Sequence, residues 1–322
     1  MSSFDLFANI HRPDLDLMYK RDDPNDPRLG EIVKSDPSTF IDSQIVILGC
    51  PQDEGVRRNK GRPGAADAPD SIRQSFYRLS VSTLDLARIR LFDSGNTIIQ
   101  DTLEATHDLH REIVRKILSD GKNLIVLGGG NDTSYPDCSA LALETQNVLA
   151  FNIDAHFDVR ADEPRNSGTP YRQLLEENHL QPERFFEMGY QLFGNSPVYL
   201  QYLAEKGVRA FSLDALRKKG IIETFKMILD NAGDSALFWG FDLDSVRAAD
   251  APGVSAPNPV GFSGDEFCQI AYLAGQHPGT RIVEFTEVNP TYDIDGRTCR
   301  LTAAAMFYYL TGYSAQKINE SV

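Results

Sequence analysis

The segment NVLAFNIDAHFDVR, residues 147–160, decides the fold, because an apolar run typical of a buried strand ends abruptly in polar residues. Side chains of an extended segment alternate between two faces, so Asp154, His156 and Asp158 project to the same side. Two carboxylates and an imidazole on one side of a strand end are potential ligands of a metal ion. The sequence therefore predicts that this strand carries part of a metal site.

Two other apolar segments end in a similar way. The segment SALFWGFDLD, residues 235–244, places Asp242 and Asp244 on one face. The segment NLIVLGGGND, residues 123–132, ends in three glycines and Asn131. Acids at the ends of several strands indicate that something cationic lies between them.

Strand and helix patterns alternate along most of the chain. We expect strands at residues 43–50, 88–95, 123–130, 147–156, 184–191, 208–213, 236–244 and 280–290. We expect helices from about Pro69 onward, at 103–121, after the loop that starts at 162, and at 215–231, 264–275 and 302–313. This alternation predicts an α/β fold with a parallel sheet covered by helices on both faces. Ligands of such sheets collect at the carboxyl ends of the strands, where the acids lie.

Length and composition indicate one globular domain. No linker divides the 322 residues, so we expect a single catalytic domain over residues 1–322, with residues 1–42 as an N-terminal arm. The formal net charge of −14 argues against nucleic acid or an anionic membrane as partner and favours a small-molecule substrate. Neither a signal peptide nor an apolar run of membrane-spanning length is found, so we expect a cytoplasmic protein.

The four cysteines have no metal-binding spacing and are expected to be free thiols. A redox role of Cys50 or Cys138 stays open. His107 and His110 lie three apart in the expected helix 103–121 and are interpreted as structural, surface or partly buried residues, because no acid-rich strand end accompanies them.

Charge balance leads from the strand ends to a metal. Asp154, Asp158, Asp242 and Asp244 bring four negative charges together, while His156 is neutral. Unpaired buried carboxylates are too unfavourable to assemble without neutralisation, and two divalent cations would cancel them. Oxygen ligands with one imidazole and no thiolate suit manganese. Solvated loop acids explain any one of these residues but not five on two matching strand ends.

These residues resemble the signatures of a known family, the arginase/agmatinase ureohydrolase superfamily. The similar segments are DAHFD at 154–158, GFDLDSVRAADAPGVSAPNPVG at 240–261, EVNP at 287–290 and GGGND at 128–132. Two further segments are similar to its formimidoylglutamase branch, namely DEGVRRNKGRPGAADAPDSIR at 53–73 and NSGTPYRQ at 166–173. The resemblance extends from about residue 45 to the C-terminus.

The resemblance implies a three-layer α/β/α sandwich, arginase-like, with a mostly parallel central sheet and two Mn²⁺ ions. It implies that Asp154 and Asp242 bridge the ions and that Asp158 completes the first site. His156 and Asp244 would complete the second site. A water shared by two such ions is acidified and can attack an amidine or guanidine carbon.

The branch implies hydrolysis of N-formimino-L-glutamate to L-glutamate and formamide. Asp158 would act as general acid towards the departing nitrogen. Glu287 would pair with the cationic C–N group of the substrate and orient its carbon. Two alternatives stay open: a hydrolase of another linear guanidine or amidine, of the agmatinase or guanidinobutyrase type, and a non-enzymatic relative. Homo-oligomerisation is a further expectation from the family.

Two departures from the family pattern affect the site. Asn131 stands where most members have a histidine ligand, and since an amide oxygen is a weaker ligand than imidazole, the first metal site is expected to be weaker. Arginases carry a shuttling histidine where this chain has Tyr171. Ser167, Tyr171 and Arg172 are therefore expected to contact the substrate. Arg57 or Arg62 would join Arg172 as bidentate carboxylate clamps, a hypothesis that rests on loop position. The loop that carries Arg57 and Arg62 has a plain alternative reading as a solvated charged loop.

Overall fold

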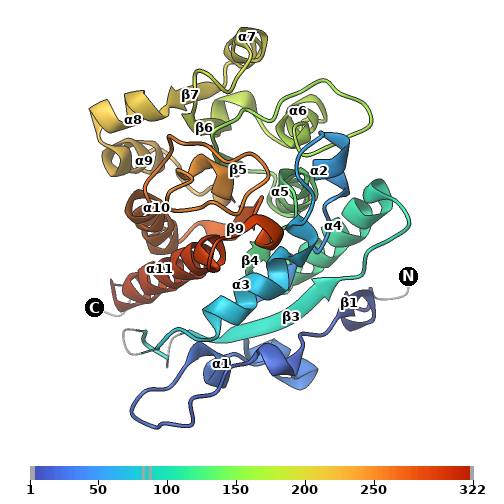
Figure 1. Cartoon of the computed structure of the whole chain (residues 1–322), viewed down its shortest axis with the longest axis vertical. Helices are drawn as coiled ribbons and strands as arrows, with labels where there is room; N and C mark the ends of the chain where they lie inside the picture. The colour runs from blue at the N-terminus through green and yellow to red at the C-terminus, as the bar shows by residue number, and fades with distance from the viewer. Residues whose placement is uncertain (1–3, 82–83, 87–88, 320–322) are drawn as a thin grey trace.

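A nine-stranded sheet forms the centre of the computed structural model, which describes residues 4–81, 84–86 and 89–319 (Figure 1). The strands follow the order β1-β3-β2-β4-β9-β8-β5-β6-β7, and all neighbours pair in parallel except β1 with β3. The strands are β1 (Ile10–His11), β2 (Ile45–Gly49), β3 (Leu91–Thr97), β4 (Asn123–Leu127), β5 (Val148–Ile153), β6 (Phe185–Tyr190), β7 (Arg209–Ser212), β8 (Ala236–Asp242) and β9 (Thr280–Thr286).

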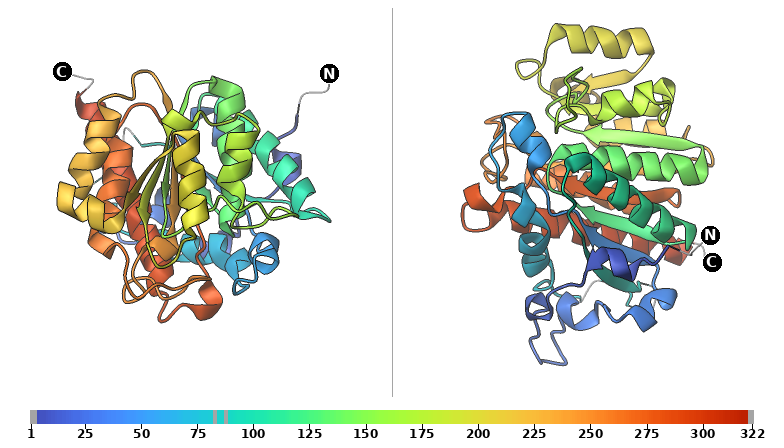
Figure 2. Two further views of the ribbon diagram at one scale, coloured as in Figure 1. Left: turned by 90° about the horizontal axis from the view of Figure 1, so that it is seen from above. Right: turned by 90° about the vertical axis from the view of Figure 1, so that its right-hand side faces the viewer.

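Helices cover both faces of this sheet. They are α1 (Leu29–Ile32), α2 (Glu54–Arg58), α3 (Ala68–Phe76), α4 (Leu103–Ser119), α5 (Ser134–Thr145), α6 (Pro170–Glu176), α7 (Pro197–Lys206), α8 (Leu213–Lys219), α9 (Ile221–Leu229), α10 (Gly264–Gln276) and α11 (Arg297–Asn319). Helices α3 and α8 to α11 contribute to one buried cluster and α4 to α7 to the other. Figure 2 shows the red and orange α10 and α11 on one side of the sheet and the green α5 and α6 on the opposite side. The predicted three-layer α/β/α architecture is thus confirmed.

Strand β5 shows how the sequence builds the two layers. Its residues Leu149, Phe151 and Ile153 belong to one buried cluster, whereas Val148 and Ala150 belong to the other. A strand that is apolar on both faces must be covered on both sides, as expected for a central parallel strand. The apolar run that precedes the acids therefore fixes β5 in the middle of the molecule.

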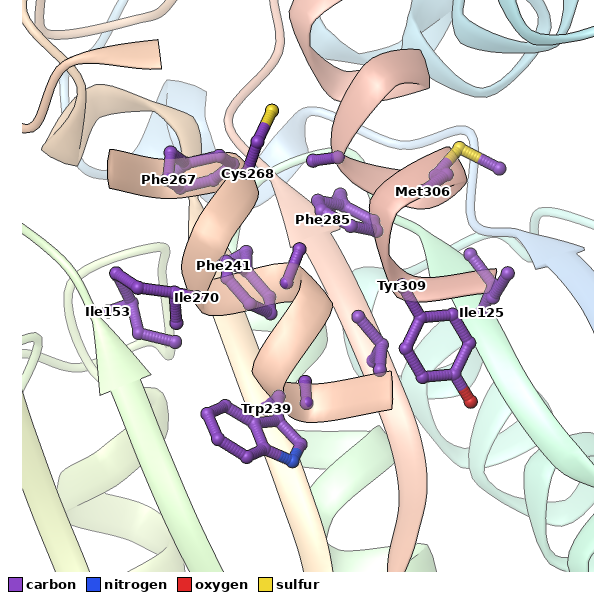
Figure 3. Close-up of a cluster of buried hydrophobic side chains, with 14 of the residues drawn as sticks. Ile125, Ile153, Trp239, Phe241, Phe267, Cys268, Ile270, Phe285, Met306 and Tyr309 are labelled. Carbon is purple, nitrogen blue, oxygen red and sulfur yellow. The ribbon is translucent and has the colours of Figure 1, made fainter. Parts of the chain in front are cut away.

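The larger cluster joins the centre of the sheet to α10 and α11 (Figure 3). There, Trp239 and Phe241 of β8 face the buried Ile270 of α10 and Tyr309 of α11. The Trp239 ring stacks on Phe151 of β5 with centroids 4.4 Å apart. Aromatic contacts of this kind add to the large apolar area that these side chains bury.

Two glycines bring α10 and α11 together. A Cβ atom on Gly275 would lie 2.0 Å from the carbonyl oxygen of Tyr309, and one on Gly312 would lie 2.1 Å from that of Tyr272. Neither distance is compatible with a side chain, so the two backbones meet only because both residues are glycine.

The N-terminal arm lies along the outer edge of β3. Strand β1 pairs with the end of β3 in antiparallel register, with Ile10 opposite Thr97. Further along the arm, Lys34 donates its N–H to Leu91 O at 3.1 Å and accepts from Asp93 N at 2.8 Å. The N-terminal arm thus contains short regular pieces, β1 and α1, whose polar and proline-rich sequence gives no strand or helix periodicity.

Other elements differ from the sequence-based expectation. The helix expected at 215–231 is two helices, α8 and α9, because Gly220 adopts φ 89° between them. The long loop after β2 contains the short helix α2, and α7 was not predicted. Arg88, the first residue of the strand expected at 88–95, lies outside the described residues. Among the described residues, no helix is both long and apolar enough to cross a membrane.

Candidate metal centre

Four neighbouring strands in the middle of the sheet deliver the polar side chains. In sheet order they are β4, β9, β8 and β5, all parallel, so their carboxyl ends meet at one edge. The residues at these ends are Asn131 after β4, Glu287 after β9, Asp242 and Asp244 at the end of β8, and Asp154, His156 and Asp158 after β5.

The structure brings the acids and the histidine into two groups that share Asp154. Ligand atoms of Asp154, Asp158 and Asp242 lie within 4.8 Å of one another, and so do those of Asp154, His156 and Asp244. We call the first group, with Asn131 beside it, the first position, and the second group the second position. The placement agrees with an arrangement in which Asp154 serves two ions.

Local hydrogen bonds aim the aspartates. Asp154 Oδ1 accepts from the backbone N–H of His156 at 2.7 Å. In the same way, Asp242 Oδ1 accepts from the N–H of Asp244 at 2.8 Å. Each bond fixes the turn that follows its strand, while Asp154 Oδ2 accepts from Asn131 Nδ2 and Asn152 Nδ2, both at 3.3 Å. The shared D-x-[HD] pattern of both strand ends is the sequence basis of this geometry.

Two residues of the cluster adopt a left-handed backbone. Asp158 has φ 46° and Glu287 has φ 63°. This conformation is unfavourable for residues other than glycine and is concentrated at functional sites. Glu287 is held there by two bonds across the β4 and β9 loops, since its N–H donates to Gly129 O at 2.9 Å and its Oε1 accepts from Asn131 N at 2.8 Å.

Burial and mutual repulsion raise the proton affinity of the acids. Burial, followed by the charge of Asp244, raises the pKa of Asp154 to about 6. The same causes raise the pKa of Asp242 well above its usual value, and burial with the charge of Asp154 does so for Asp158. The charge of Asp244, first among several causes, raises the pKa of His156 to about 12. The cluster therefore demands positive charge, either protons or cations.

These residues fit a pair of divalent ions. Asp154, Asp242 and Asp244 are almost fully buried, and Asp244 Oδ1 has no hydrogen-bond partner among the described residues. No lysine or arginine of the described chain forms an ion pair with any of the four aspartates. Buried carboxylates that lack cationic side chains are stabilised by metal ions, and oxygen donors with one imidazole suit manganese.

The cluster forms the floor of a cavity of about 500 Å³. Asp158, Asp242, Asp244 and Glu287 line it, together with His156. Ser167, predicted to contact the substrate, also lines it and accepts a hydrogen bond from Asn59 Nδ2 at 3.0 Å. A cavity of this size accommodates a small metabolite.

The predicted arginine clamps lie away from this cavity. Arg57 pairs with Asp53 in its own helix and is exposed. Arg62 donates to the carbonyl oxygens of residues 254 and 255 and lies over the ring of Tyr292. Their sequence position near the loop tip gives no information on which way the side chains point.

Two other predicted contacts are also directed elsewhere. Arg172 donates to Val159 O at 2.8 Å and lies over the Tyr202 ring, on the outer side of α6. Tyr171 is completely buried and stacks on Phe185 with ring centroids 4.9 Å apart. Its hydroxyl lies 3.4 Å from Ser134 Oγ in the core, so the residue at the position of the arginase shuttle histidine does not line the cavity.

Lys60 and Arg160 supply the cationic groups of the cavity instead. Both line it, both are exposed, and neither forms an ion pair within the described chain. Lys60 has φ 63°, and the backbone N–H of Arg160 donates to Gly168 O at 2.8 Å. Arg160 follows the DAHFD segment by two residues, so its closeness to the aspartates along the chain was a signal available in the sequence.

His107 and His110 are structural but fully buried, not at the surface. His107 Nε2 lies 2.7 Å from Asp132 Oδ2, and His110 Nε2 lies 2.9 Å from Asp137 Oδ1. Both aspartates lie in or next to the N-terminal turn of α5, behind the first position. The expectation of partly exposed histidines was wrong because the acids that pair with them are distant in sequence.

Comparison with known proteins identifies the class that this fold and site define. The model of the arginase family matches residues 43–312, and the chain belongs to that family. It is similar to a formimidoylglutamase of Geobacillus kaustophilus, with 34% identity over 272 residues, 83% of either chain. A formimidoylglutamase of Staphylococcus aureus is 32% identical over 91% of this chain and 100% of its own length.

Solved structures show the same relationship. The crystal structure of Trypanosoma cruzi formiminoglutamase with Mn²⁺ superposes with a TM-score of 0.85 at 33% identity, over 90% of this chain and 99% of that one. The formimidoylglutamase of Bacillus subtilis has a TM-score of 0.86 at 27% identity, over 92% and 95% of the two chains. The resemblance to the arginase superfamily and its formimidoylglutamase branch is thereby confirmed.

Proposed function

We propose that this protein is a manganese-dependent formimidoylglutamase that hydrolyses N-formimino-L-glutamate to L-glutamate and formamide. One observation supports it most directly. One cavity combines buried acids suited to two divalent ions with Lys60 and Arg160, two cationic side chains that form no ion pair with any other described residue. The similarity to formimidoylglutamases, one of them solved with Mn²⁺, supports the same conclusion.

The charges of the substrate match this arrangement. N-formimino-L-glutamate carries an amidine at one end and two carboxylates at the other. The amidine fits the acidic floor beside Glu287, and the carboxylates fit Lys60 and Arg160. Agmatine has a cationic amine where formiminoglutamate has carboxylates, so it would meet repulsion from both side chains.

The reaction requires water to add to the amidine carbon and the bond to the glutamate nitrogen to break. Two divalent ions held by the aspartates and His156 would lower the pKa of a water between them, so that it reacts near neutral pH. Asp158, which lines the cavity, would pass a proton to the departing glutamate nitrogen. With a cationic amidine as substrate, water supplies the oxygen of formamide, and its two protons both end on the glutamate nitrogen, which leaves as an ammonium group.

Glu287 is the group that we propose to orient the amidine. Its Oε1 is used by Asn131 N–H, and its Oε2 is bonded to the Ser255 hydroxyl at the cavity wall. Burial raises the pKa of Glu287 to about 8, with the charge of Asp244 as a further cause. A cationic amidine would favour the ionised carboxylate, because a nearby positive charge lowers the pKa of a carboxyl group.

A substrate panel tests the proposal. Manganese-loaded protein is assayed with formiminoglutamate, agmatine, guanidinobutyrate and arginine, with formamide and urea detected separately. We expect formamide from formiminoglutamate to exceed urea from every other substrate. Urea formation from agmatine or guanidinobutyrate as the faster reaction would assign the chain to another branch, and no turnover of any substrate would favour a non-enzymatic relative.

Substitution of the two cavity cations tests substrate recognition. Lys60→Ala and Arg160→Ala are expected to raise KM for formiminoglutamate by about tenfold each, because a charged hydrogen bond contributes about 1.5 kcal/mol or more. Arg57→Ala is the matched control, since that exposed side chain pairs with Asp53 and does not line the cavity. Unchanged KM in both cavity variants would show that the carboxylates bind elsewhere.

We also propose one domain, a cytoplasmic location and assembly into homo-oligomers. One sheet includes strands from residue 10 to residue 286, which supports a single domain. All four cysteines are buried free thiols, as is usual in a reducing compartment. Leu192, Phe193 and Val198 are each about two-thirds exposed near the start of α7, an apolar group suited to subunit contact. Light scattering of the purified protein tests the assembly.

A further inference from the structure

The side-chain amide of Asn131 has different neighbours at its two ends. Its Nδ2 donates to Asp158 Oδ2 at 2.7 Å and to Asp154 Oδ2 at 3.3 Å. Its Oδ1 accepts from Ser134 Oγ at 2.9 Å and from Thr286 Oγ1 at 3.0 Å. The amide oxygen is the atom that can bind a cation, and in this orientation it faces two hydroxyl groups rather than the carboxylates.

Ser134 has one hydroxyl proton and two acceptors. Besides Asn131 Oδ1, Glu284 Oε2 lies 2.7 Å from its Oγ. The proton can be given to only one of them. Glu284 Oε2 is the nearer acceptor, at 2.7 Å against 2.9 Å for Asn131 Oδ1, so Glu284 is the favoured acceptor. When Ser134 donates to Glu284, only its lone pairs remain for Asn131.

That choice determines the orientation of the amide. The Tyr171 hydroxyl, 3.4 Å away, can donate to one lone pair of Ser134 Oγ. The other lone pair would repel an amide oxygen at 2.9 Å, so Asn131 would turn its Nδ2 towards Ser134 and its Oδ1 towards Asp154 and Asp158. Thr286 Oγ1 can accept a hydrogen bond as readily as it can donate one, so it allows either orientation. The orientation with Oδ1 towards the carboxylates is the one that a metal ligand requires.

Glu284 belongs to a buried group that contains no lysine or arginine. Asp137 is close enough for its charge to act on Glu284, and Asp137 Oδ1 lies 2.9 Å from His110 Nε2. His110 Nδ1 in turn lies 2.6 Å from Thr97 Oγ1. Glu284, Asp137 and His110 are all completely buried, so their relative positions are set by packing within α4, α5 and β9. The acceptor for Ser134 is therefore fixed in place.

We propose that Ser134 is a positioning residue: it donates its proton to Glu284 and so holds the carbonyl oxygen of Asn131 towards the carboxylates of the first position. Ser134 thereby sets the affinity of that position without contacting the ion. This inference rests on the proposed function, because it requires a divalent cation at the first position. The inference explains how the Asn131 amide can replace an imidazole at the first position, because Ser134 sets the orientation of the amide from the side opposite the carboxylates.

The test measures Mn²⁺ binding to the full chain. The protein is dialysed against chelator to remove metal, and Mn²⁺ is then titrated into it in a calorimeter. The two binding steps are assigned with Asp158→Ala, which removes a ligand of the first position, and His156→Ala, which removes one of the second. Ser134→Ala is expected to weaken the first position about tenfold, because one oriented buried hydrogen bond is lost. The second position is expected to change by less than about twofold by the same reasoning.

Ser139→Ala is the matched control. Ser139 is completely buried in the same helix, but its hydroxyl donates to Pro136 O at 3.1 Å and has no contact with Asn131. We expect both Mn²⁺ affinities of this variant to equal those of the parent protein. Equal weakening of the first position by Ser139→Ala and Ser134→Ala would overturn the proposal, because helix packing would then explain both.

A double-mutant cycle shows whether Ser134 acts through Asn131. In an Asn131→Ala background, Ser134→Ala is expected to have no further effect on the first position. The same tenfold loss in that background, equal weakening of both positions, or no loss at all would overturn the inference. If the parent protein bound no Mn²⁺, the proposed function would fail instead, so the two failures are distinguishable.

Discussion

Asp154 is the residue that belongs to both groups of potential metal ligands. Its two oxygens have different tasks, since Oδ1 is bonded to the N–H of His156 and Oδ2 faces the first position, where it lies 3.3 Å from Asn131 Nδ2. The residue is completely buried at the end of an apolar strand. No other residue of the cluster belongs to both groups of potential ligands.

Asp154→Asn is expected to weaken Mn²⁺ binding at both positions by more than about 100-fold, because loss of a group that only supports a ligand already costs 10- to 100-fold. Metal content per chain after dialysis measures the effect. Asp162→Asn, an exposed acid eight residues further on, is the control and should retain full metal content. Retention of one ion per chain in Asp154→Asn would show that the positions do not share this carboxylate.

Asn131→His is expected to tighten the first position. Imidazole is a stronger ligand than an amide oxygen, so the variant should hold close to two Mn²⁺ per chain after dialysis, where the parent protein holds fewer. Metal analysis by plasma spectrometry, together with protein concentration, gives the ratio. Equal metal content of the two proteins would mean that Asn131 does not limit affinity.

The convergence of Asp154, His156 and Asp158 was expected from the period of two of a strand. The three residues do converge, but they lie in the turn after β5, which ends at Ile153, so the turn and not strand alternation directs their side chains. Arg57, Arg62 and Arg172 lie in or near short helices after loops, where sequence spacing gives no direction, and none of the three lines the cavity.

Strands and helices followed the sequence where apolar periodicity was strong. Strand β5 and its neighbours in the sheet are apolar on both faces and end within a few residues of the expected bounds. Elements with weak periodicity were missed, such as β1 and α7. The break at Gly220 was also missed. Many helices tolerate a glycine, and only packing in the folded protein decides whether the helix continues through it or ends there.

Gly275→Ala tests the contact between α10 and α11. Alanine favours a helix by about 1 kcal/mol over glycine, but the new methyl group would overlap the carbonyl oxygen of Tyr309. Overpacking of this kind costs about 1–3 kcal/mol, so we expect a net loss of stability and a Tm lower by roughly 3 °C. Calorimetry measures it. Gln269→Ala, an exposed position of the same helix, should leave Tm unchanged or slightly higher.

The whole molecule holds an unusual number of buried carboxyl groups with raised pKa values. Burial raises the pKa of Asp137 to about 8, and burial with the charge of Asp244 raises the pKa of Glu287 to about 8. In the unfolded chain these groups ionise near pH 4. Between about pH 4 and 8 the folded protein therefore binds more protons than the unfolded chain, and its stability falls as pH rises.

Metal removal is expected to reveal this dependence. Chelator-treated protein should show a Tm that falls from pH 6 to pH 8, whereas Mn²⁺ should raise Tm by more at pH 8 than at pH 6, because deprotonated carboxylates bind the ion. Scanning calorimetry with and without Mn²⁺ at both pH values measures this. A Tm increment from Mn²⁺ that is the same at both pH values would contradict the expectation.

The order of the sheet explains why the site as a whole could be predicted. Any right-handed parallel α/β sheet brings its strand ends to one edge, so acids after several strands must converge. Which strands are neighbours could not be read from the sequence, because β4, β9, β8 and β5 are adjacent in space but not along the chain. The buried pairs of His107 and His110 with aspartates depend on the same long-range order.

The arm along β3 has a consequence for solubility. Strand β3 is an outer strand, and its backbone donors and acceptors would attract a second sheet if they were left open. Ile10 and Lys34 of the arm occupy part of this row from opposite ends. The arm therefore covers backbone groups of β3 that could pair with another sheet. Its removal would promote aggregation through β3, while the residues that face the metal would keep their positions.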